Sequence, residues 1–326
     1  PAQVALAGDR ARRAELDEEG DHRVDGVLGG AQRGVCPGLL AANGHRSIIA
    51  RGPRAWRRAG ALATQSSVSA PSSPRDPQRK LASFTRIAHR GASGECPENT
   101  LVAFRRALEL GAEMIECDLQ LTADGHVVIV HDWTVERTTS GAGNVRDLPL
   151  DELRALDAGS WRDERFAGER IPTLEETLDL VLPRAQLNLE LKSQVEDTRL
   201  ALAAVAAVSQ HRALDRVIFS SFDMELLEEV REASPYAQIG VLWSRPPFDE
   251  AWRYARDLGA IALHPHAAFV SADLVAEAKD RGLVVNTWTV NTVDAMVELV
   301  RRGVDGVISD HPGRLLEARA QLLARG

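Results

Sequence analysis

From Phe84 onward, short apolar runs alternate with longer segments of helical periodicity. The apolar runs finish in polar or charged residues and predict strands: RIAHR, EMIECDLQL, LNLEL, RVIFSS, QIGVLW, AIALH, VVNTWTV and GVISD. Apolar residues three and four positions apart predict helices between them, over 99–111, 173–183, 198–211, 223–233, 249–259, 271–282 and 292–303. Asn99 or Thr100 is suited to cap the first helix, and Gly111 and Gly259 are suited to end two others.

This alternation predicts an α/β fold and is compatible with two architectures. Eight strands with intervening helices over about 240 residues fit a (β/α)8 TIM barrel. A doubly wound open sheet is the alternative. No glycine-rich phosphate loop opens the first helix, and charged residues lie at the ends of most strands instead of at one switch point. The pattern therefore favours the closed barrel.

One stretch departs from the alternation. TADG, residues 122–125, lies between two strand-like runs and predicts a tight turn near Asp124, so that VVIVHD folds back on the second strand. The hairpin would bring His131 level with the carboxylates of that strand. Residues 133–171 are too many for a plain connection, and we expect them to form an insertion that caps the barrel mouth.

The first 80 residues lack sustained periodicity and are rich in Gly, Ala, Arg, Ser and Pro. Such a composition cannot bury enough apolar surface to offset chain entropy. We therefore expect residues 1–83 to be a disordered extension or an over-long gene model, followed by one (β/α)8 barrel domain over 84–326. A basic tether for an acidic partner and a cleaved targeting segment are the alternatives.

Charge and composition limit the partners. Residues 1–80 carry 13 Lys and Arg against 8 Asp and Glu, whereas the rest carries 26 against 39. An acidic body repels nucleic acid and anionic membranes, so a small-molecule substrate is expected. No apolar run approaches the roughly 18 to 20 residues of a membrane span, so no stable membrane insertion is expected. The three cysteines are odd in number and lack metal-ligand spacing, which favours a reducing compartment, the cytoplasm, or the absence of a structural disulfide. The oligomeric state is left open.

Three carboxylates at strand ends are the candidate metal ligands. Glu116 and Asp118 are two residues apart on a predicted strand, so their side chains share a face while Cys117 points away. Like charges side by side repel, and a hard cation removes that repulsion. Glu190 ends another apolar strand. Three oxygen ligands suit one Mg²⁺ or Ca²⁺ ion better than Zn²⁺.

Two histidines and two cations complete the parts of a phosphodiester hydrolase. His89 and His131 are candidates for acid–base chemistry, although a lone strand-end histidine is more often structural. Arg90 and Lys192 are candidates to hold phosphate oxygens. Lys192 is one of only three lysines in the chain, and Arg90 has Glu98 as an alternative partner.

Four further histidines are expected to lie outside the site. His264 and His266 form an H-x-H pair without a third ligand at suitable spacing, which favours a structural role. His311 is expected in a loop after the last strand, and His126 on the surface after the turn.

Six ordered motifs carry a family resemblance: HRG (89–91), PENT (97–100), E-x-D (116–118), HD (131–132), E-x-K (190–192) and WTVN (288–291). In this order, from about Thr85 to the C-terminus, they resemble the glycerophosphodiester phosphodiesterases. Cys117 departs from the bulky aliphatic residue usual between the two metal carboxylates.

The resemblance implies a metal-dependent hydrolase that converts glycerophosphodiesters to sn-glycerol 3-phosphate and an alcohol. It implies that His89 is the base and His131 the acid, and that a glycerol hydroxyl attacks first to give a cyclic phosphate that water then opens. Trp288 in NTWTVN is expected at the mouth of a late strand, where its ring can pack against the glycerol or an alkyl substituent; a purely structural tryptophan is the alternative. A lysophospholipase D-like enzyme is the alternative and would need an apolar groove within 133–171. A non-catalytic phosphodiester-binding barrel is more remote, because such relatives lose a histidine or a metal carboxylate and this chain keeps all five.

Overall fold

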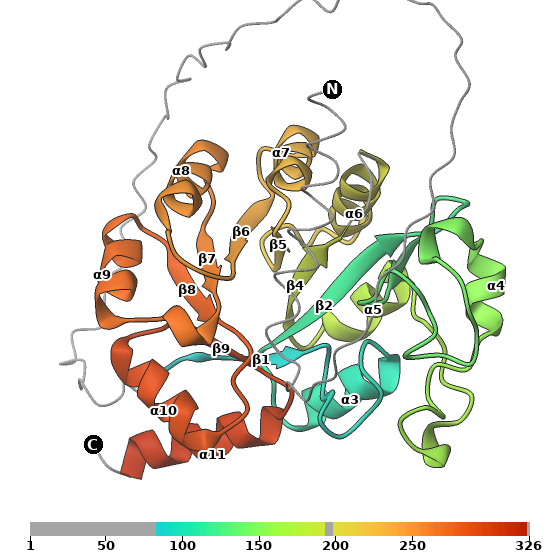
Figure 1. Cartoon of the computed structure of the whole chain (residues 1–326), viewed down its shortest axis with the longest axis horizontal. Coiled ribbons are helices and arrows are strands. Elements are labelled where there is room, and N and C mark those ends of the chain that lie inside the picture. Colours follow the sequence, from blue (N-terminus) through green and yellow to red (C-terminus); the bar gives the residue numbers. More distant parts are fainter. Residues whose placement is uncertain (1–82, 193–197, 325–326) are drawn as a thin grey trace, which may run out of the picture. The chain divides into compact units, whose positions relative to one another are not determined.

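The computed structural model describes residues 83–192 and 198–324. Eight parallel strands close into a barrel in the order β1-β9-β8-β7-β6-β5-β4-β2, and β2 pairs back with β1 (Figure 1). The barrel strands are β1 (Thr85–His89), β2 (Met114–Leu121), β4 (Gln186–Leu191), β5 (Val217–Ser221), β6 (Gln238–Trp243), β7 (Ala262–Pro265), β8 (Val284–Thr287) and β9 (Gly306–Ser309). The predicted (β/α)8 barrel is confirmed.

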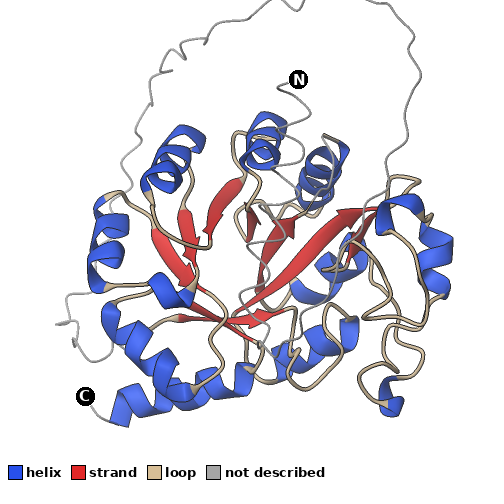
Figure 2. Cartoon of the chain, in the orientation of Figure 1, coloured by secondary structure: helices blue, strands red, loops and turns tan. Residues whose placement is uncertain are grey.

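Helices surround the strands (Figure 2). They are α3 (Leu101–Glu109), α5 (Leu174–Val181), α6 (Arg199–Gln210), α7 (Met224–Ala233), α8 (Asp249–Leu258), α9 (Ala272–Asp280), α10 (Val293–Arg302) and α11 (Pro312–Ala324). A 3-10 turn, η4 (Ala267–Phe269), lies between β7 and α9. The C-terminal helix α11 was not among the predicted helices, although Leu315, Ala318 and Leu322 form its buried stripe at helical spacing.

Strand alternation separates the hydrophobic core from the barrel lumen. Leu119 and Leu189 are fully buried in the large apolar cluster between the strands and the helices. On β2, Glu116 and Asp118 are two residues apart and share the face opposite to that of Leu119, so they point toward the lumen. Cys117 belongs to the apolar cluster, as its position between the two carboxylates predicts.

Local signals set the helix ends. The Thr100 side chain accepts a hydrogen bond from the Ala103 N–H and caps α3. Thr173 and Glu176 form a reciprocal capping box at the start of α5. Gly259 ends α8 in the left-handed conformation, with φ of 59°, which a residue with a Cβ adopts at a cost.

The expected hairpin is present. β3 (Val127–Ile129) pairs antiparallel with the outer end of β2, with Leu121 opposite Val127. In the turn, Asp124 accepts hydrogen bonds from the Thr122 hydroxyl and from the Leu150 N–H. The hairpin therefore returns the chain to the level of Asp118, where the Val130 N–H donates to the Asp118 carbonyl immediately before His131.

The insertion after β3 has a small core of its own. It contains η2 (Val145–Asp147), α4 (Leu150–Ala155) and η3 (Glu164–Phe166). Val135, Val145 and Leu153 are fully buried in a separate cluster with residues of β3. In Figure 1 the insertion, with α4, stands beside β2 and α5. Arg162 and Arg165 donate hydrogen bonds to the carbonyls of Gly94 and Glu95, so the insertion flanks the mouth on the β1–β2 side.

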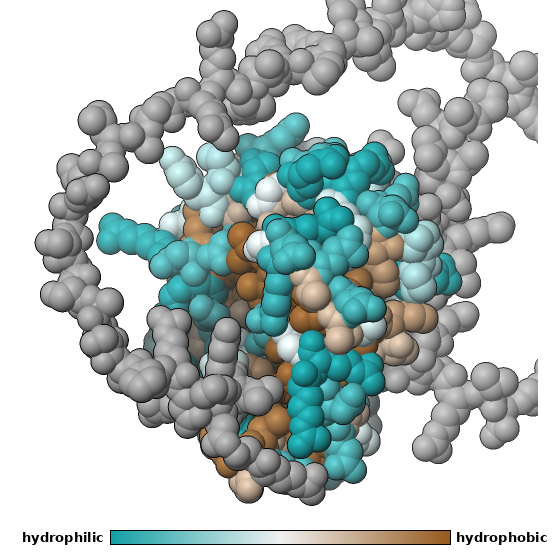
Figure 3. Space-filling model, turned by 90° about the vertical axis from the view of Figure 1, so that its left-hand side faces the viewer, coloured by the Kyte–Doolittle hydropathy of each residue, from teal (hydrophilic) through white to brown (hydrophobic). Residues whose placement is uncertain are grey.

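The expected extension, residues 1–83, lies outside the described part of the chain apart from its last residue. Among the described helices, none is long and apolar enough to cross a membrane. On the face shown in Figure 3, hydrophobic side chains are visible mainly between hydrophilic ones.

Candidate active site

The candidate residues gather where three neighbouring strands end. His89 is the last residue of β1, Asp118 lies on β2, and Glu190 lies opposite it on β4. The carboxyl ends of parallel barrel strands meet at one face, so residues from separate segments come together there. The structure thus brings together side chains separated by about 100 residues in the sequence.

Glu116, Asp118 and Glu190 form the acidic group of the site. One carboxylate oxygen from each lies within 4.8 Å of the others. Burial and the neighbouring charge of Asp118 raise the pKa of Glu116 to about 7. A buried carboxyl group that keeps its proton up to neutral pH can exchange that proton for a bound cation. The donor set, three hard oxygens, therefore fits Mg²⁺ or Ca²⁺.

Asp118 is held by three side chains from two loops, the one after β1 and the one after β4. The Asn99 side-chain amide donates to Asp118 over 2.8 Å, and the Arg90 Nε lies 3.4 Å from the same oxygen. The Lys192 Nζ lies 3.8 Å from its other oxygen. Burial would raise the pKa of Asp118, but His131, Arg90 and Lys192 lower it well below the usual range. Asp118 is therefore a carboxylate even without a cation.

His89 is oriented by a carboxylate from the far end of the chain. Its Nδ1 lies 2.6 Å from Asp310 Oδ1, and its Nε2 lies 3.9 Å from Glu116 Oε2. Burial and Arg90 would lower the pKa of His89, but the hydrogen bond to Asp310 and the charge of Glu116 outweigh them and raise it. Because ionised Asp310 can only accept, Nδ1 carries the hydrogen and Nε2 faces the site.

Asp310 is itself fixed by two further donors. The Asn291 side-chain amide donates to it over 2.6 Å and the Ser93 hydroxyl over 3.0 Å. Burial opposes ionisation, but the hydrogen bonds from His89, Asn291 and Ser93 lower the pKa of Asp310 far below its usual range. The residue was not among the predicted site residues. Its position directly after the last barrel strand was the signal that could have found it.

His131 has the same kind of partner. Its Nδ1 lies 2.7 Å from Asp132 Oδ1, in the loop that leaves the hairpin. The buried Gln120 amide donates to the carbonyls of Val130, His131 and Asp132 and fixes that loop to β2. Burial, Arg90 and Lys192 lower the pKa of His131. Asp132 and Gln120 were also missed by the sequence analysis.

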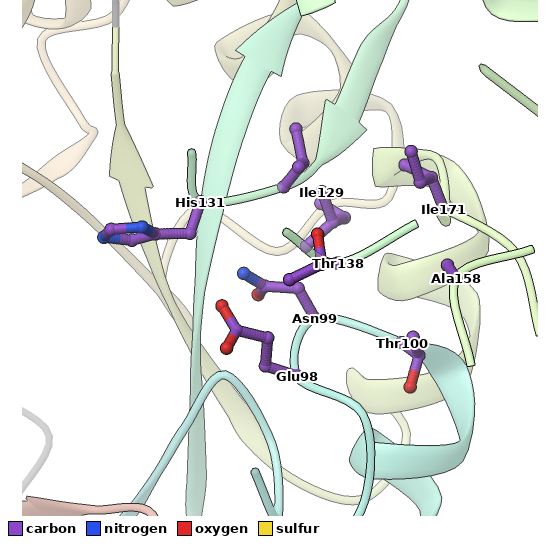
Figure 4. A pocket seen from close by; sticks show the side chains of 9 residues that line it. Glu98, Asn99, Thr100, Ile129, His131, Thr138, Ala158 and Ile171 are labelled. Carbon is purple, nitrogen blue, oxygen red and sulfur yellow. The ribbon is translucent and has the colours of Figure 1, made fainter. Parts of the chain in front are cut away.

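Arg90 and Glu98 form an ion pair, the alternative that the sequence left open. The Arg90 Nη1 donates to Glu98 over 2.9 Å, and the Arg90 backbone N–H donates to Glu116 over 3.0 Å. Arg137 from the insertion also donates to Glu98. Figure 4 shows Glu98, Asn99 and His131 on the side of a small cavity opposite Ala158 and Ile171. The volume of this cavity is about 10 Å³, no more than one water centre requires.

Trp288 lies directly after β8, beside the lumen and among other ring side chains. Its ring packs over the buried Ile87, Met114, Ile218 and Ile308, and its Nε1 donates to the His264 carbonyl over 2.9 Å. Phe222 meets it edge-on at a centroid separation of 5.5 Å. Trp133, where the insertion begins, has its ring 5.8 Å from the Lys192 Nζ. Trp288 is thus available as an apolar surface above the lumen.

Four further histidines of the described part of the chain lie outside the acidic group. His264 is buried and takes a hydrogen bond from Asn286, and burial lowers its pKa to about 4. His266 caps η4 through Ala268 N–H. His126 is exposed beside Asp124, and His311 follows Asp310 in the loop before α11. Among residues 83–192 and 198–324, the Glu116, Asp118 and Glu190 group is the candidate metal site.

The arrangement has the groups to hold a phosphodiester between an acidic side, whose oxygens suit a cation, and two oriented imidazoles. Carboxylates supply hard ligands, the imidazoles exchange protons, and Arg90 and Lys192 supply positive charge. These groups line one end of the barrel, the face on which TIM-barrel enzymes carry their active sites.

Comparisons with known proteins agree with this arrangement. The model of the glycerophosphoryl diester phosphodiesterase family matches residues 89–314. A glycerophosphodiester phosphodiesterase from Caldanaerobacter subterraneus subsp. tengcongensis is 42% identical over 232 residues, 71% of this chain and 95% of that protein. One from Bacillus altitudinis is 33% identical over 241 residues, 72% of this chain and 98% of that protein. A solved Oleispira antarctica phosphodiesterase, in complex with the product sn-glycerol-3-phosphate, superposes with a TM-score of 0.69 at 34% identity, over 73% of this chain and 98% of that one.

Proposed function

The chain belongs to the glycerophosphoryl diester phosphodiesterase family and is a phosphoric diester hydrolase, and we propose that it converts glycerophosphodiesters to sn-glycerol 3-phosphate and an alcohol with one bound divalent cation. One observation carries the proposal. Three buried or half-buried carboxylates converge beside two histidines, each with its Nδ1 on an aspartate. The sn-glycerol-3-phosphate in the Oleispira antarctica relative supports the same substrate class.

Glu116, Asp118 and Glu190 would hold the cation, and their oxygen donors suit Mg²⁺ or Ca²⁺. When bound, a divalent cation neutralises the clustered carboxylates and polarises a phosphoryl oxygen. Asn99 and the Arg90 backbone N–H fix two of the carboxylates before any cation arrives, so the ligands are arranged in advance.

Arg90 and Lys192 would bind the remaining phosphate oxygens. Both side chains already lie against Asp118, at 3.4 Å and 3.8 Å, and therefore beside the proposed cation. Their charge stabilises the negative charge that grows on the phosphorane-like transition state. The hydrogen bond to Glu98 limits the movement of the Arg90 guanidinium and so fixes the direction in which its other N–H groups point.

His89 and His131 would transfer the protons. Asp310 and Asp132 accept the Nδ1 hydrogen of each imidazole, so Nε2 is the nitrogen of each ring that would exchange a proton with the substrate. By the proposed division, His89 Nε2 accepts a proton from the attacking glycerol hydroxyl, and His131 Nε2 donates one to the departing alcohol, which leaves a cyclic phosphate. Water then opens the cyclic phosphate to sn-glycerol 3-phosphate, with His131 accepting a proton from the water and His89 returning its proton to the glycerol oxygen.

The raised pKa of His89 and the lowered pKa of His131 both run against this division of roles. The charge of Glu116 contributes to the first shift and the charges of Arg90 and Lys192 to the second. A cation on Glu116 and a phosphate on Arg90 and Lys192 would offset those charges.

A small, deacylated substrate is proposed. Trp288 supplies an apolar surface for the glycerol, while the charged groups bind the phosphate. The lysophospholipase D-like alternative required an apolar groove in the insertion. There, Trp161 donates its Nε1 hydrogen to the Ala158 carbonyl, and Phe166 lies under the Arg165 guanidinium. No observation among the described residues favours that alternative.

The purified protein should be assayed with glycerophosphocholine, glycerophosphoethanolamine, glycerophosphoinositol and lysophosphatidylcholine. Each substrate should be tested with Mg²⁺, with Ca²⁺ and with EDTA. We expect cation-dependent release of sn-glycerol 3-phosphate from the deacylated substrates. Turnover of lysophosphatidylcholine alone, or turnover insensitive to EDTA, would contradict the proposal.

A further inference from the structure

One arginine of the insertion binds two carboxylates that belong to different loops. Arg137 donates from Nη1 and Nη2 to the two oxygens of Glu98, at 2.8 Å each. It also donates from Nη2 to Asp132 Oδ1 over 3.0 Å and from Nε to Asp132 Oδ2. A single guanidinium therefore joins the loop after β1 to the loop after β3.

Each of those carboxylates holds a residue of the proposed site. Asp132 accepts the Nδ1 hydrogen of His131 over 2.7 Å, and Glu98 accepts from Arg90 over 2.9 Å. The order of contacts is His131, Asp132, Arg137, Glu98, Arg90. Arg137 is the only one of these five that comes from the insertion, and nothing in its contacts places it against the substrate.

The geometry points to Arg137 as a positioning residue for His131, acting through Asp132. The Asp132 side chain is 29% exposed, so without a second partner its carboxylate can turn toward solvent. The planar guanidinium has enough donors, in a fixed fork, to engage both carboxylates at once. A lysine has one nitrogen and cannot match both pairs of oxygens. The insertion would thus contribute to proton transfer and not merely flank the mouth.

This inference rests on the proposed function, in which His131 protonates the leaving alcohol. Loss of a group that orients a functional histidine typically costs about 10 to 100-fold in activity. The loss should depend on the leaving group. Choline departs as a poor alkoxide that needs the proton, whereas p-nitrophenolate departs without it. A merely structural ion pair would affect both substrates alike.

The test compares Arg137→Ala, Arg137→Lys and the control Arg146→Ala in the full chain. Arg146 belongs to the same insertion, is about half exposed, and pairs with Asp147 at 3.6 Å. Wild-type turnover of glycerophosphocholine is measured first, so that failure of the proposed function is recognised separately. The variants are then assayed with glycerophosphocholine and with the p-nitrophenyl ester of glycerol 3-phosphate.

For Arg137→Ala we expect kcat on glycerophosphocholine to fall about 10 to 100-fold, with KM little changed and the nitrophenyl ester turned over near the wild-type rate. Added guanidinium should restore part of the choline-ester rate, because the Arg137 side chain is 43% exposed and its space is accessible. Arg137→Lys should recover less than half of the rate, and Arg146→Ala should match wild type. Unchanged kcat in Arg137→Ala, or equal losses on the two substrates, would overturn the inference.

Discussion

Replacing Glu116 with glutamine should stabilise the cation-free protein at alkaline pH while it abolishes activity. Burial and Asp118 raise the pKa of Glu116 from 4.5 to about 7. The folded protein thus holds this proton more tightly than the unfolded chain does. Below pH 4.5 both states are protonated and the site costs nothing. Between pH 4.5 and 7, Glu116 ionises in the unfolded chain but not in the folded protein, so the free energy of unfolding falls. Above pH 7 that decrease is complete.

The size of the effect follows from the shift. Because the pKa of Glu116 rises from 4.5 to about 7, the free energy of unfolding is lowered by about 3 kcal/mol at pH 8 and by about 1 kcal/mol at pH 5. For a domain of this size, about 3 kcal/mol is roughly 6 to 12 °C in Tm. Glutamine keeps the volume and the oxygen that accepts the Arg90 N–H, but it carries no charge.

The assay is thermal unfolding at pH 5 and pH 8 in EDTA, repeated with Mg²⁺ or Ca²⁺. Wild type should gain Tm at pH 8 on addition of the cation, and Glu116→Gln should gain much less. Glu298→Gln, which removes an exposed carboxylate 3.2 Å from Arg302, is the control and should leave Tm unchanged. A lower Tm for Glu116→Gln in EDTA at pH 8, or an equal shift at both pH values, would refute the reasoning.

Three further predictions concern catalysis and the limits of the domain. His89→Ala and His131→Ala should each lower kcat by roughly 10² to 10⁴-fold in steady-state assays, and the double variant should lose much less than the product, because both act in one transition state; near wild-type turnover would remove that histidine from the mechanism. A chain starting near Lys80 should keep soluble, cation-dependent turnover, because β1 begins at Thr85, and lost activity would count against this. Finally, kcat/KM for glycerophosphocholine should exceed that for lysophosphatidylcholine, and Trp288→Ala should raise KM without weakening the cation; the reverse substrate order would favour the lysophospholipase D-like enzyme.

Much of the fold was readable because it depends on local periodicity. The barrel strands and the helices between them follow from apolar spacing, and the turn residues Thr122–Gly125 predict the hairpin. The missed α11 comes after the last strand, where no following strand required a connecting helix. Leu315, Ala318 and Leu322 have helical spacing, but the charged residues between them weaken the apolar pattern of 312–324.

The site was readable where its chemistry lies within one strand. The Glu116 and Asp118 pair follows from strand alternation alone, and Glu190 needed only its position at a strand end. Asp310 was missed because it meets His89 only through closure of the barrel, 221 positions along the chain. Arg137 was missed because it lies in an irregular insertion, where no periodicity indicates which loops its side chain will reach.

The most direct test of the account is to follow glycerophosphocholine by ³¹P NMR as the purified protein acts on it. With Mg²⁺ or Ca²⁺, wild type should convert the diester signal to that of sn-glycerol 3-phosphate, and both EDTA and the Glu190→Ala substitution should stop the conversion. The appearance of phosphocholine would mean that the other ester bond is cleaved. That result, or full conversion in EDTA, would contradict a cation-dependent glycerophosphodiesterase built on Glu116, Asp118 and Glu190.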